Sequence, residues 1–333
     1  MLDLTAFFNE LAQSNSTVTE SAAFSALPIP GFSQHRIACD STGAPTILLS
    51  TSEKRSEKRP LSIVLEHLSV QFDIECRIFK LHGGTETGSF TIIRCAGTDA
   101  ILQIYFLRVV AALIESIGYS PSRSEVALAI NKLLELFRAL SAPSLKTVRG
   151  LWAELFLIAQ ASNPAMLVAA WHSTPDAIYD FCEGNQRIEV KSAKTRVRQH
   201  HFRLEQLQPP AGTDVLIASL FVESAGAGLS LGDLLERVRL RINTSPDLVF
   251  QLEQIVGLTL GQSLQRAMEE RFDYELAKES IAFFDVQDIP SVSSALPPGV
   301  SEVHFKSDLT SQVPSNTAQL RNLQGIFRAA MSR

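Results

Sequence analysis

The chain has 333 residues, of which 45% are hydrophobic and 20% are charged, and its formal net charge is −5. This length and composition predict a soluble globular protein with two or more domains. The negative net charge excludes binding to nucleic acid through overall charge, so any such surface must be local.

Neither a membrane segment nor an export signal is expected. The sequence has no apolar run of about 18 residues, and its first residues lack the basic start of a signal peptide. The four cysteines lack the close spacing of a zinc site, which favours a reducing, cytoplasmic setting. They are Cys39, Cys76, Cys95 and Cys182.

Residues 1–140 predict an N-terminal α+β domain. A Ser-Glu-Lys-Arg tetrapeptide, repeated over 52–59, predicts a solvated loop, with a DNA-contacting loop as the alternative. Because no catalytic pattern occurs here, we expect a recognition or assembly domain. The patterns predict a helix over 2–12, a loop over 26–31, strands over 35–39, 46–50, 68–80 and 89–95, and helices over 99–117 and 123–140.

The next domain, predicted over 141–225, opens with a helix over 147–159. Its apolar residues Leu151, Leu155 and Ile158 share one face, and Glu154 lies between them. A carboxylate on an inward face needs a partner. A glutamate at the edge of the face, reaching solvent, is the alternative. A second helix is expected from Asn163-Pro164 to Trp171.

The stretch 179–191 predicts a β-hairpin. Gly184-Asn185 can supply the positive φ angles of a two-residue turn. With that turn, Asp180 lies opposite Glu189, and alternation of side chains puts Lys191 on their face. The other face is apolar and comprises Tyr179, Phe181, Ile188 and Val190.

The polar face of this hairpin is the candidate catalytic site. Directly opposed side chains lie about 5 Å apart, and like charges there are destabilising. A divalent cation is the simplest reason for such a pair, and oxygen ligands suit Mg²⁺ or Mn²⁺. We expect Asp180 and Glu189 to bind it and Lys191 to polarise water or offset charge on a phosphate. Asp176 is the alternative to Asp180, and an ordinary exposed hairpin face is the alternative to the site.

A basic segment follows the hairpin. Residues 187–203 carry six cations and one acid, which is a local charge of +5. Such a segment beside the acids predicts contact with a phosphate backbone, with a solvated loop as the alternative. Strand and helix both remain open for 198–206. Besides Arg187 and Lys191, the cations are the candidate DNA ligands Lys194, Arg196, Arg198 and Arg203.

The C-terminal part, 226–333, predicts an extension packed on this domain. Before it, 214–222 reads as a strand of the sheet interior. The patterns that follow predict helices over 229–242, 246–257 and 262–279, strands over 281–286 and 301–306, and a closing helix over 316–331.

The motifs together resemble those of the PD-(D/E)XK nuclease superfamily. An Asp, a short gap and Glu-x-Lys occur as Asp180 and Glu189-Val190-Lys191. Together with the motifs around them, these residues are similar to a narrower group, the restriction-associated PD-(D/E)XK-motif proteins found with bacterial phage-defence genes. The motif match covers about residues 146 to 221. The matching motifs are Gly150 to Leu155, Trp171, Asp180-Phe181, Ile188 to Ser192, Arg198-x-His200 and Gln206-Leu207.

The resemblance implies a restriction-endonuclease-like α/β core, a mixed sheet flanked by helices. It implies that the two acids bind Mg²⁺ or Mn²⁺, that Glu154 points at the metal, and that Gln206 supports the lysine, with a plain surface glutamine as the alternative. His201 is a candidate proton carrier, although a solvent-facing histidine is the simpler reading.

The expected function is a metal-dependent DNA endonuclease in bacterial restriction or phage defence. The alternative is an inactive subunit of such a complex that binds DNA or protein. Expected partners are DNA and other restriction or defence proteins, without a membrane, and a homodimer is one option for the assembly. A further alternative is an adaptor protein whose N-terminal half binds the partner.

Overall fold

A computed structural model of the chain describes residues 2–13, 23–39, 42–52, 60–79, 84–97, 99–172, 177–292, 297 and 299–332. Most of the duplicated tetrapeptide, 53–59, and the alternative acid Asp176 lie outside these residues. The chain divides into two compact units, each described by itself below. The first comprises Met1–Pro143 and Asn243–Gly257, and the second comprises Ser144–Ile242 and Leu258–Arg333.

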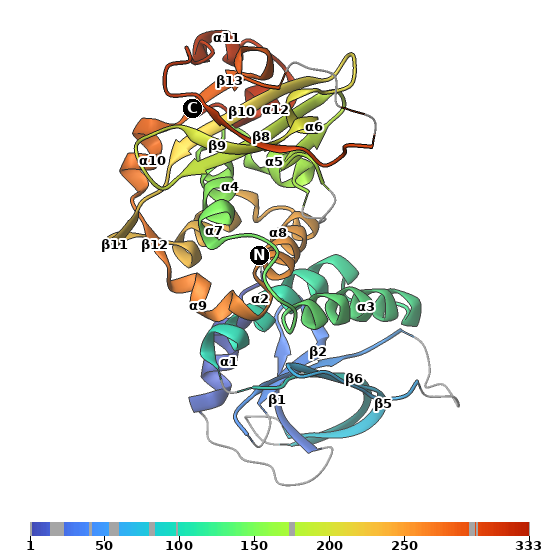
Figure 1. Cartoon of the computed structure of the whole chain (residues 1–333). Coiled ribbons are helices and arrows are strands. Elements are labelled where there is room, and N and C mark those ends of the chain that lie inside the picture. The colour runs from blue at the N-terminus through green and yellow to red at the C-terminus, as the bar shows by residue number, and fades with distance from the viewer. Residues whose placement is uncertain are drawn as a thin grey trace. The chain divides into compact units, whose positions relative to one another are not determined.

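The first unit is built on a strongly curved sheet (Figure 1). Its strands follow the order β1-β2-β3-β6-β5-β4, and β1 also pairs in parallel with β5, which closes the sheet on itself. Closure removes exposed strand edges and encloses a core. The strands are β1 (Ala23–Ile29), β2 (Phe32–Cys39), β3 (Pro45–Leu49), β4 (Ile63–Val64), β5 (Leu68–Phe79) and β6 (Thr85–Cys95).

The loop predicted over 26–31 is largely strand. Residues of β1 pair with β2 from Ser25 to Ile29, and Gly31 turns the chain with a φ of 78°. Propensity missed this strand because Pro28 and Pro30 argue against one. The antiparallel pairing of Ser25 to Ile29 with β2 overrides that local preference.

Three helices accompany this sheet in sequence: α1 (Leu4–Gln13), α2 (Ala100–Ile117) and α3 (Arg123–Ala139). Ser122 and Glu125 form a reciprocal capping box at the start of α3. Within the described residues, α2 alone has the length and hydropathy of a membrane span, and 56% of that window is buried inside the structure. Its Phe106 packs edge-on against Phe137 of α3, which fits a core helix of a soluble protein.

The second unit contains a four-stranded mixed sheet in the order β13-β10-β8-β7. The central pair β8–β10 is parallel and its two outer pairs are antiparallel. Helices α4 and α12 contact β8, and α10 contacts β10. The strands are β7 (Phe181–Glu183), β8 (Gln186–Ala193), β10 (Asp214–Phe221) and β13 (Ala282–Asp285), and the helices are α4 (Val148–Gln160), α10 (Tyr274–Ser280) and α12 (Gly325–Ala330).

Two further strand pairs belong to this unit. β9 (Gln199–Arg203) pairs with β14 (His304–Asp308), and β11 (Ser224–Ser230) pairs with β12 (Arg271–Phe272). The segment 198–206 therefore contains both options, a strand followed by the short helix α6 (Leu204–Leu207). The division between the two units falls within α8 (Pro246–Leu260). The remaining helices are α5 (Pro164–Ala170), α7 (Leu231–Ile242), α9 (Leu264–Glu269) and α11 (Thr317–Arg321).

Two long helices predicted near the C-terminus are wrong. The pattern over 262–279 is split into α9, β12 and α10, because Asp273 caps a new helix by accepting from Leu276 N–H. The pattern over 316–331 is split into α11 and α12, and Gly325, the first residue of α12, has a φ of 63°. Helical periodicity survives such breaks, since each short helix still buries one face.

The hairpin at 181–188 has the predicted register. Phe181 pairs with Ile188 and Cys182 with Arg187, and Gly184 has a φ of 52°. The ladder stops at Phe181, however, so Asp180 and Tyr179 do not continue it. The carbonyl of Asp180 instead accepts from His172 N–H, which draws this segment toward residue 172.

Replacing Gly184 with alanine should lower the free energy of unfolding by about 1 kcal/mol, since a Cβ is disfavoured in the left-handed region. Nothing lies within 4 Å of the added Cβ, so packing should not contribute. Both tryptophans, Trp152 and Trp171, belong to the second unit, so urea unfolding followed by tryptophan fluorescence reports on it.

The matched control is Gly226→Ala, because Gly226 also has open space around its Cβ position but no positive φ. An equal loss of stability in the two variants would show that the turn does not depend on the left-handed residue.

Candidate active site

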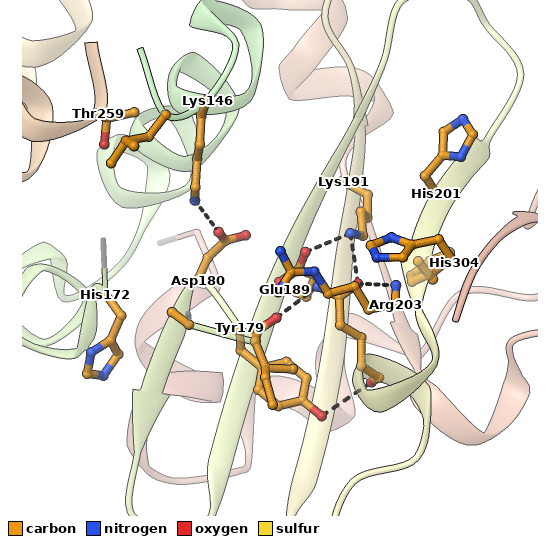
Figure 2. A pocket seen from close by; sticks show the side chains of 15 residues that line it. Lys146, His172, Tyr179, Asp180, Glu189, Lys191, His201, Arg203, Thr259 and His304 are labelled. Atoms are coloured by element: carbon orange, nitrogen blue, oxygen red, sulfur yellow. Dashed lines mark hydrogen bonds and ion pairs between the residues drawn. The ribbon is translucent and has the colours of Figure 1, made fainter. Parts of the chain in front are cut away.

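A cavity of about 370 Å³ opens in the second unit at the hairpin (Figure 2). It gathers residues from the start of α4, the hairpin, β9, α6 and β14, which are far apart in sequence. The lining residues are Leu145, Lys146, His172, Ala177, Ile178, Tyr179, Asp180, Glu189, Lys191, His201, Phe202, Arg203, Gln206, Thr259 and His304.

Glu154 lies on the inward face of α4, behind this cavity. Thr147 caps the helix by accepting from Gly150 N–H, which sets its start and therefore its rotation. Glu154 is only 4% exposed, and its Oε2 accepts from Trp171 Nε1 at 2.8 Å. The glutamate is therefore not a residue at the edge of the face that reaches solvent.

Asp180 is held from two sides. Its Oδ2 accepts from the Val190 N–H at 2.9 Å, which is the backbone donor of the residue that follows Glu189. Its Oδ1 accepts from Lys146 Nζ at 2.6 Å, and the same ammonium group donates to Glu154 Oε1 at 2.8 Å. Lys146 thus connects the two carboxylates.

Lys191 is held in the cavity by three contacts. Its Nζ donates to Glu189 Oε1 at 2.7 Å and to Gln206 Oε1 at 3.1 Å, and it lies 5.0 Å from the centre of the Phe202 ring. Gln206 is oriented in turn by donating to the Ile178 carbonyl at 2.8 Å. Gln206 is buried rather than a plain surface glutamine, and it contacts the lysine directly.

Burial dominates the electrostatics of these groups. It raises the pKa of Glu154 to about 8 and the pKa of Glu189 to about 7, and in both cases the charge of Asp180 adds to the effect. Burial alone would lower the pKa of Lys146, but the charges of Asp180 and Glu154 outweigh it and raise that pKa. The three acids face two ammonium groups, so the cluster has one negative charge in excess when all are ionised.

The chemistry of these donors fits a hard divalent cation. Carboxylate oxygens are the ligands that Mg²⁺ and Mn²⁺ prefer, and an excess of buried negative charge favours an added cation. In this structure, however, no three His, Cys, Asp or Glu side chains of the described residues converge closely enough to hold a metal. Glu154, Asp180 and Glu189 are instead directed at Lys146 and Lys191.

The basic segment divides between the cavity, the surface and the interior. Arg203 lines the cavity, and Lys194 and Arg196 are exposed, the latter 3.5 Å from Glu223. Arg198 lies elsewhere: its Nη1 donates to the Ser219 carbonyl at 2.7 Å, and its Nη2 donates to the Ser280 carbonyl. Because these donors are directed into the fold, we leave Arg198 out of the candidate DNA contacts.

His201 is exposed and lines the cavity, whereas its neighbour His200 is buried against Ser219. Burial lowers the pKa of His200 to about 3, with a further contribution from Lys191, so this ring stays neutral. Of these two neighbours, His201 therefore has the access that a proton carrier needs.

The predicted apolar face needs one correction. Phe181 stacks on Trp171 as an interior residue, but Tyr179 packs with Val215 and Ile217, the β10 partners of Arg187 and Glu189. Its hydroxyl donates to the Glu205 carbonyl at 3.0 Å. Tyr179 changes sides because regular strand alternation ends at Phe181.

Sequence patterns did not reveal three cationic or titratable residues of the cavity: Lys146, His172 and His304. Lys146 precedes the cap of α4, and a lone lysine at that place carries no distinctive signal. His304 reaches the cavity because β14 pairs with β9, where it stands opposite Arg203. Such a pairing between distant segments is invisible in local periodicity.

A family model described as "Putative PD-(D/E)XK family member, (DUF4420)" matches residues 4–310 of the chain. No curated protein and no solved structure matches the chain significantly.

Stability of the metal-free protein should fall as pH rises from about 5 to about 8. Over this range the folded state keeps protons on Glu154 and Glu189 that the unfolded state has released near pH 4.3, so unfolding releases protons. Replacing either residue with glutamine should flatten this pH dependence. The slope lost is at most about 1.4 kcal/mol per pH unit for each carboxyl group.

The measurement is urea unfolding at several pH values in the presence of a chelator, followed by tryptophan fluorescence. Glu279→Gln is the control, because it removes an exposed acid of the same unit. A slope that is as steep in Glu154→Gln and Glu189→Gln as in the control would contradict the raised pKa values.

Proposed function

Because the chain belongs to the PD-(D/E)XK family whose model matches residues 4–310, we propose that it is a metal-dependent DNA endonuclease. The reaction is hydrolysis of a phosphodiester bond with Mg²⁺ or Mn²⁺. The mixed sheet with β8 at its centre serves as a restriction-endonuclease-like core, with the hairpin and α4 presenting the site.

One observation carries this proposal. Asp180, Glu189 and Lys191 line a single cavity, and Glu154 lies behind it within reach of the same lysine as Asp180. Buried acids are costly unless their charge is used or compensated. Acids with raised pKa values that lie at an open cavity are candidates for a functional site.

Each residue of the site has its own role in the proposed reaction. Asp180 and Glu189, with Glu154, hold the cation, which when bound polarises a phosphate oxygen and lowers the pKa of a bound water. Lys191 donates to the attacking water or to a phosphate oxygen. Gln206 keeps Lys191 oriented, since it accepts from the ammonium group at 3.1 Å.

The cavity also suits a polyanionic substrate. Its exposed lining includes Arg203, His201 and His304, and Lys194 and Arg196 are exposed on the adjoining segment. Contacts of this kind bind a phosphate backbone without reading bases. In this proposal Lys194, Arg196 and Arg203 hold the DNA, and His201 exchanges protons with solvent.

The proposed setting is bacterial restriction or phage defence, in the cytoplasm, with companion proteins of such a system. The first unit then serves recognition or assembly, and a homodimer is one assembly compatible with it. These points are inferred from the resemblance of the sequence motifs to those of defence-associated proteins.

A second function, an inactive DNA- or protein-binding subunit, is favoured by one observation. The carboxylates are paired with Lys146 and Lys191, and the described residues hold no group of three metal-ligating side chains. An inactive subunit binds DNA without cutting it, with or without a divalent ion, and is indifferent to Asp180→Ala.

Cleavage of supercoiled plasmid should require Mg²⁺ or Mn²⁺ and should fall by about 100-fold or more in Lys191→Ala. The reason is that a donor aimed at developing charge in a water-poor site contributes about this much to a rate. Initial rates of nicking and linearisation on agarose gels measure the effect.

Lys278→Ala is the control for this test, because Lys278 forms an exposed pair with Glu275, 3.6 Å away, on α10. It should cut like the wild type. Cleavage by Lys191→Ala at the wild-type rate would remove the lysine from the reaction, and cleavage in excess chelator would remove the metal.

DNA affinity should fall steeply with salt, and the salt dependence should weaken by about one counterion for each phosphate contact that is lost. Binding of a short duplex to Asp180→Asn, followed by fluorescence anisotropy at several salt concentrations, measures the slope without cleavage. Adding Arg203→Gln or Arg196→Gln should reduce the slope.

Arg266→Gln is the matched control, because Arg266 is exposed on α9, away from the basic segment. If all three arginine variants have the same salt dependence, the basic segment is only a solvated surface.

A further inference from the structure

The ammonium group of Lys146 occupies the centre of a pair of buried acids. It is 2.8 Å from Glu154 Oε1 and 2.6 Å from Asp180 Oδ1. The two acids come from α4 and from the segment before β7, and the lysine comes from the segment before α4. Figure 2 shows Lys146 reaching into the cavity from the side of α4 toward Asp180.

The two acids are fixed independently of this lysine. The second oxygen of Glu154 accepts from Trp171 Nε1 at 2.8 Å, and the second oxygen of Asp180 accepts from Val190 N–H at 2.9 Å. One donor is a buried indole and the other is a backbone group of β8. The carboxylates therefore keep their places if the lysine leaves.

The lysine is the partner with room to move. Its side chain is 36% exposed, compared with 5% for Glu154 and 10% for Asp180. Lysine also has a flexible four-carbon stem, and its compact ammonium group is strongly hydrated. If the Lys146 side chain rotates toward the open cavity, water replaces its two carboxylate partners and the backbone does not have to move.

The position of the ammonium group is also the position that a cation would take. An ammonium nitrogen sits about 2.7–2.9 Å from carboxylate oxygens, whereas Mg²⁺ binds them at about 2.1 Å. A divalent ion and a lysine ammonium cannot share the space between the same two oxygens. One positive charge must leave when the other arrives.

We propose that Lys146 is the resident counter-ion of the metal-free site: it compensates the charges of Glu154 and Asp180 and is displaced when a divalent cation binds. Lys146 thus stabilises the metal-free protein and weakens its affinity for metal. This inference rests on the metal site of the proposed function.

The test is Mn²⁺ binding to the full-length protein, measured by isothermal titration calorimetry, together with melting temperatures with and without Mn²⁺. Lys146→Met keeps the length of the side chain and removes its charge. It should bind Mn²⁺ about tenfold more tightly than the wild type, because binding no longer displaces an ion pair. Its metal-free melting temperature should be lower by about 3 °C or more, and its rise on adding Mn²⁺ should be larger.

Two variants bracket this result. Lys146→Arg retains the charge and should bind Mn²⁺ nearly as weakly as the wild type. Lys278→Met removes an exposed lysine that pairs with Glu275, and both its affinity and its melting temperature should stay at the wild-type values, since exposed pairs contribute little.

The outcomes separate this inference from the proposed function. Mn²⁺ binding that is lost in Asp180→Asn but is equal or weaker in Lys146→Met overturns the exchange and leaves the metal site standing. Absence of binding in both the wild type and Lys146→Met overturns both proposals. Binding by Lys146→Met alone supports the exchange in its strongest form.

A measurement on the wild type covers the case in which Lys146→Met does not fold. The side-chain ¹⁵Nζ resonance of Lys146 should move toward that of a hydrated lysine when diamagnetic Mg²⁺ is added. A resonance that stays unchanged at saturating Mg²⁺ would overturn the exchange.

Discussion

The second unit depends on the compensation of three buried carboxylates. Glu154, Asp180 and Glu189 are all buried, and taking such charges out of water is costly. Two lysines, one indole N–H and one backbone N–H meet this cost in part. The residual cost appears as the raised pKa values of both glutamates. A fold keeps such a cluster when the charge serves a function, because apolar residues would pack more favourably.

The architecture around the cluster makes that compensation specific. The hairpin turn at Gly184 sets the register of β8, the parallel partner β10 covers its other edge, and α4 brings Glu154 from behind. Several of the side chains in the cavity are fixed by a second contact, as Gln206 of α6 is fixed by the Ile178 carbonyl. Groups held in this way need little reorganisation when a charged ligand arrives, which is the basis of electrostatic catalysis.

Family membership and site geometry support each other at different levels. The family match covers residues 4–310, and the geometry shows which neighbours compensate the buried acids of the second unit. Lys146 is the clearest case, because it neutralises acids on two different elements and yet lies in the most exposed part of the cluster. Although the chain has a net charge of −5, cationic side chains lie in and beside this cavity.

Local sequence determined the features that depend on neighbouring residues alone: the helix that begins after Thr147, the hairpin register from Phe181 to Ile188, and the shared face of Glu189 and Lys191. Turn chemistry and side-chain alternation act within a few residues, so they can be read directly. Tertiary structure decided the partner of Glu154, the inward course of Arg198, the change of side at Tyr179 and the breaks in the two C-terminal helices. Those outcomes depend on contacts between segments distant in the chain, and a buried charge selects its partner by position in space rather than by distance along the sequence.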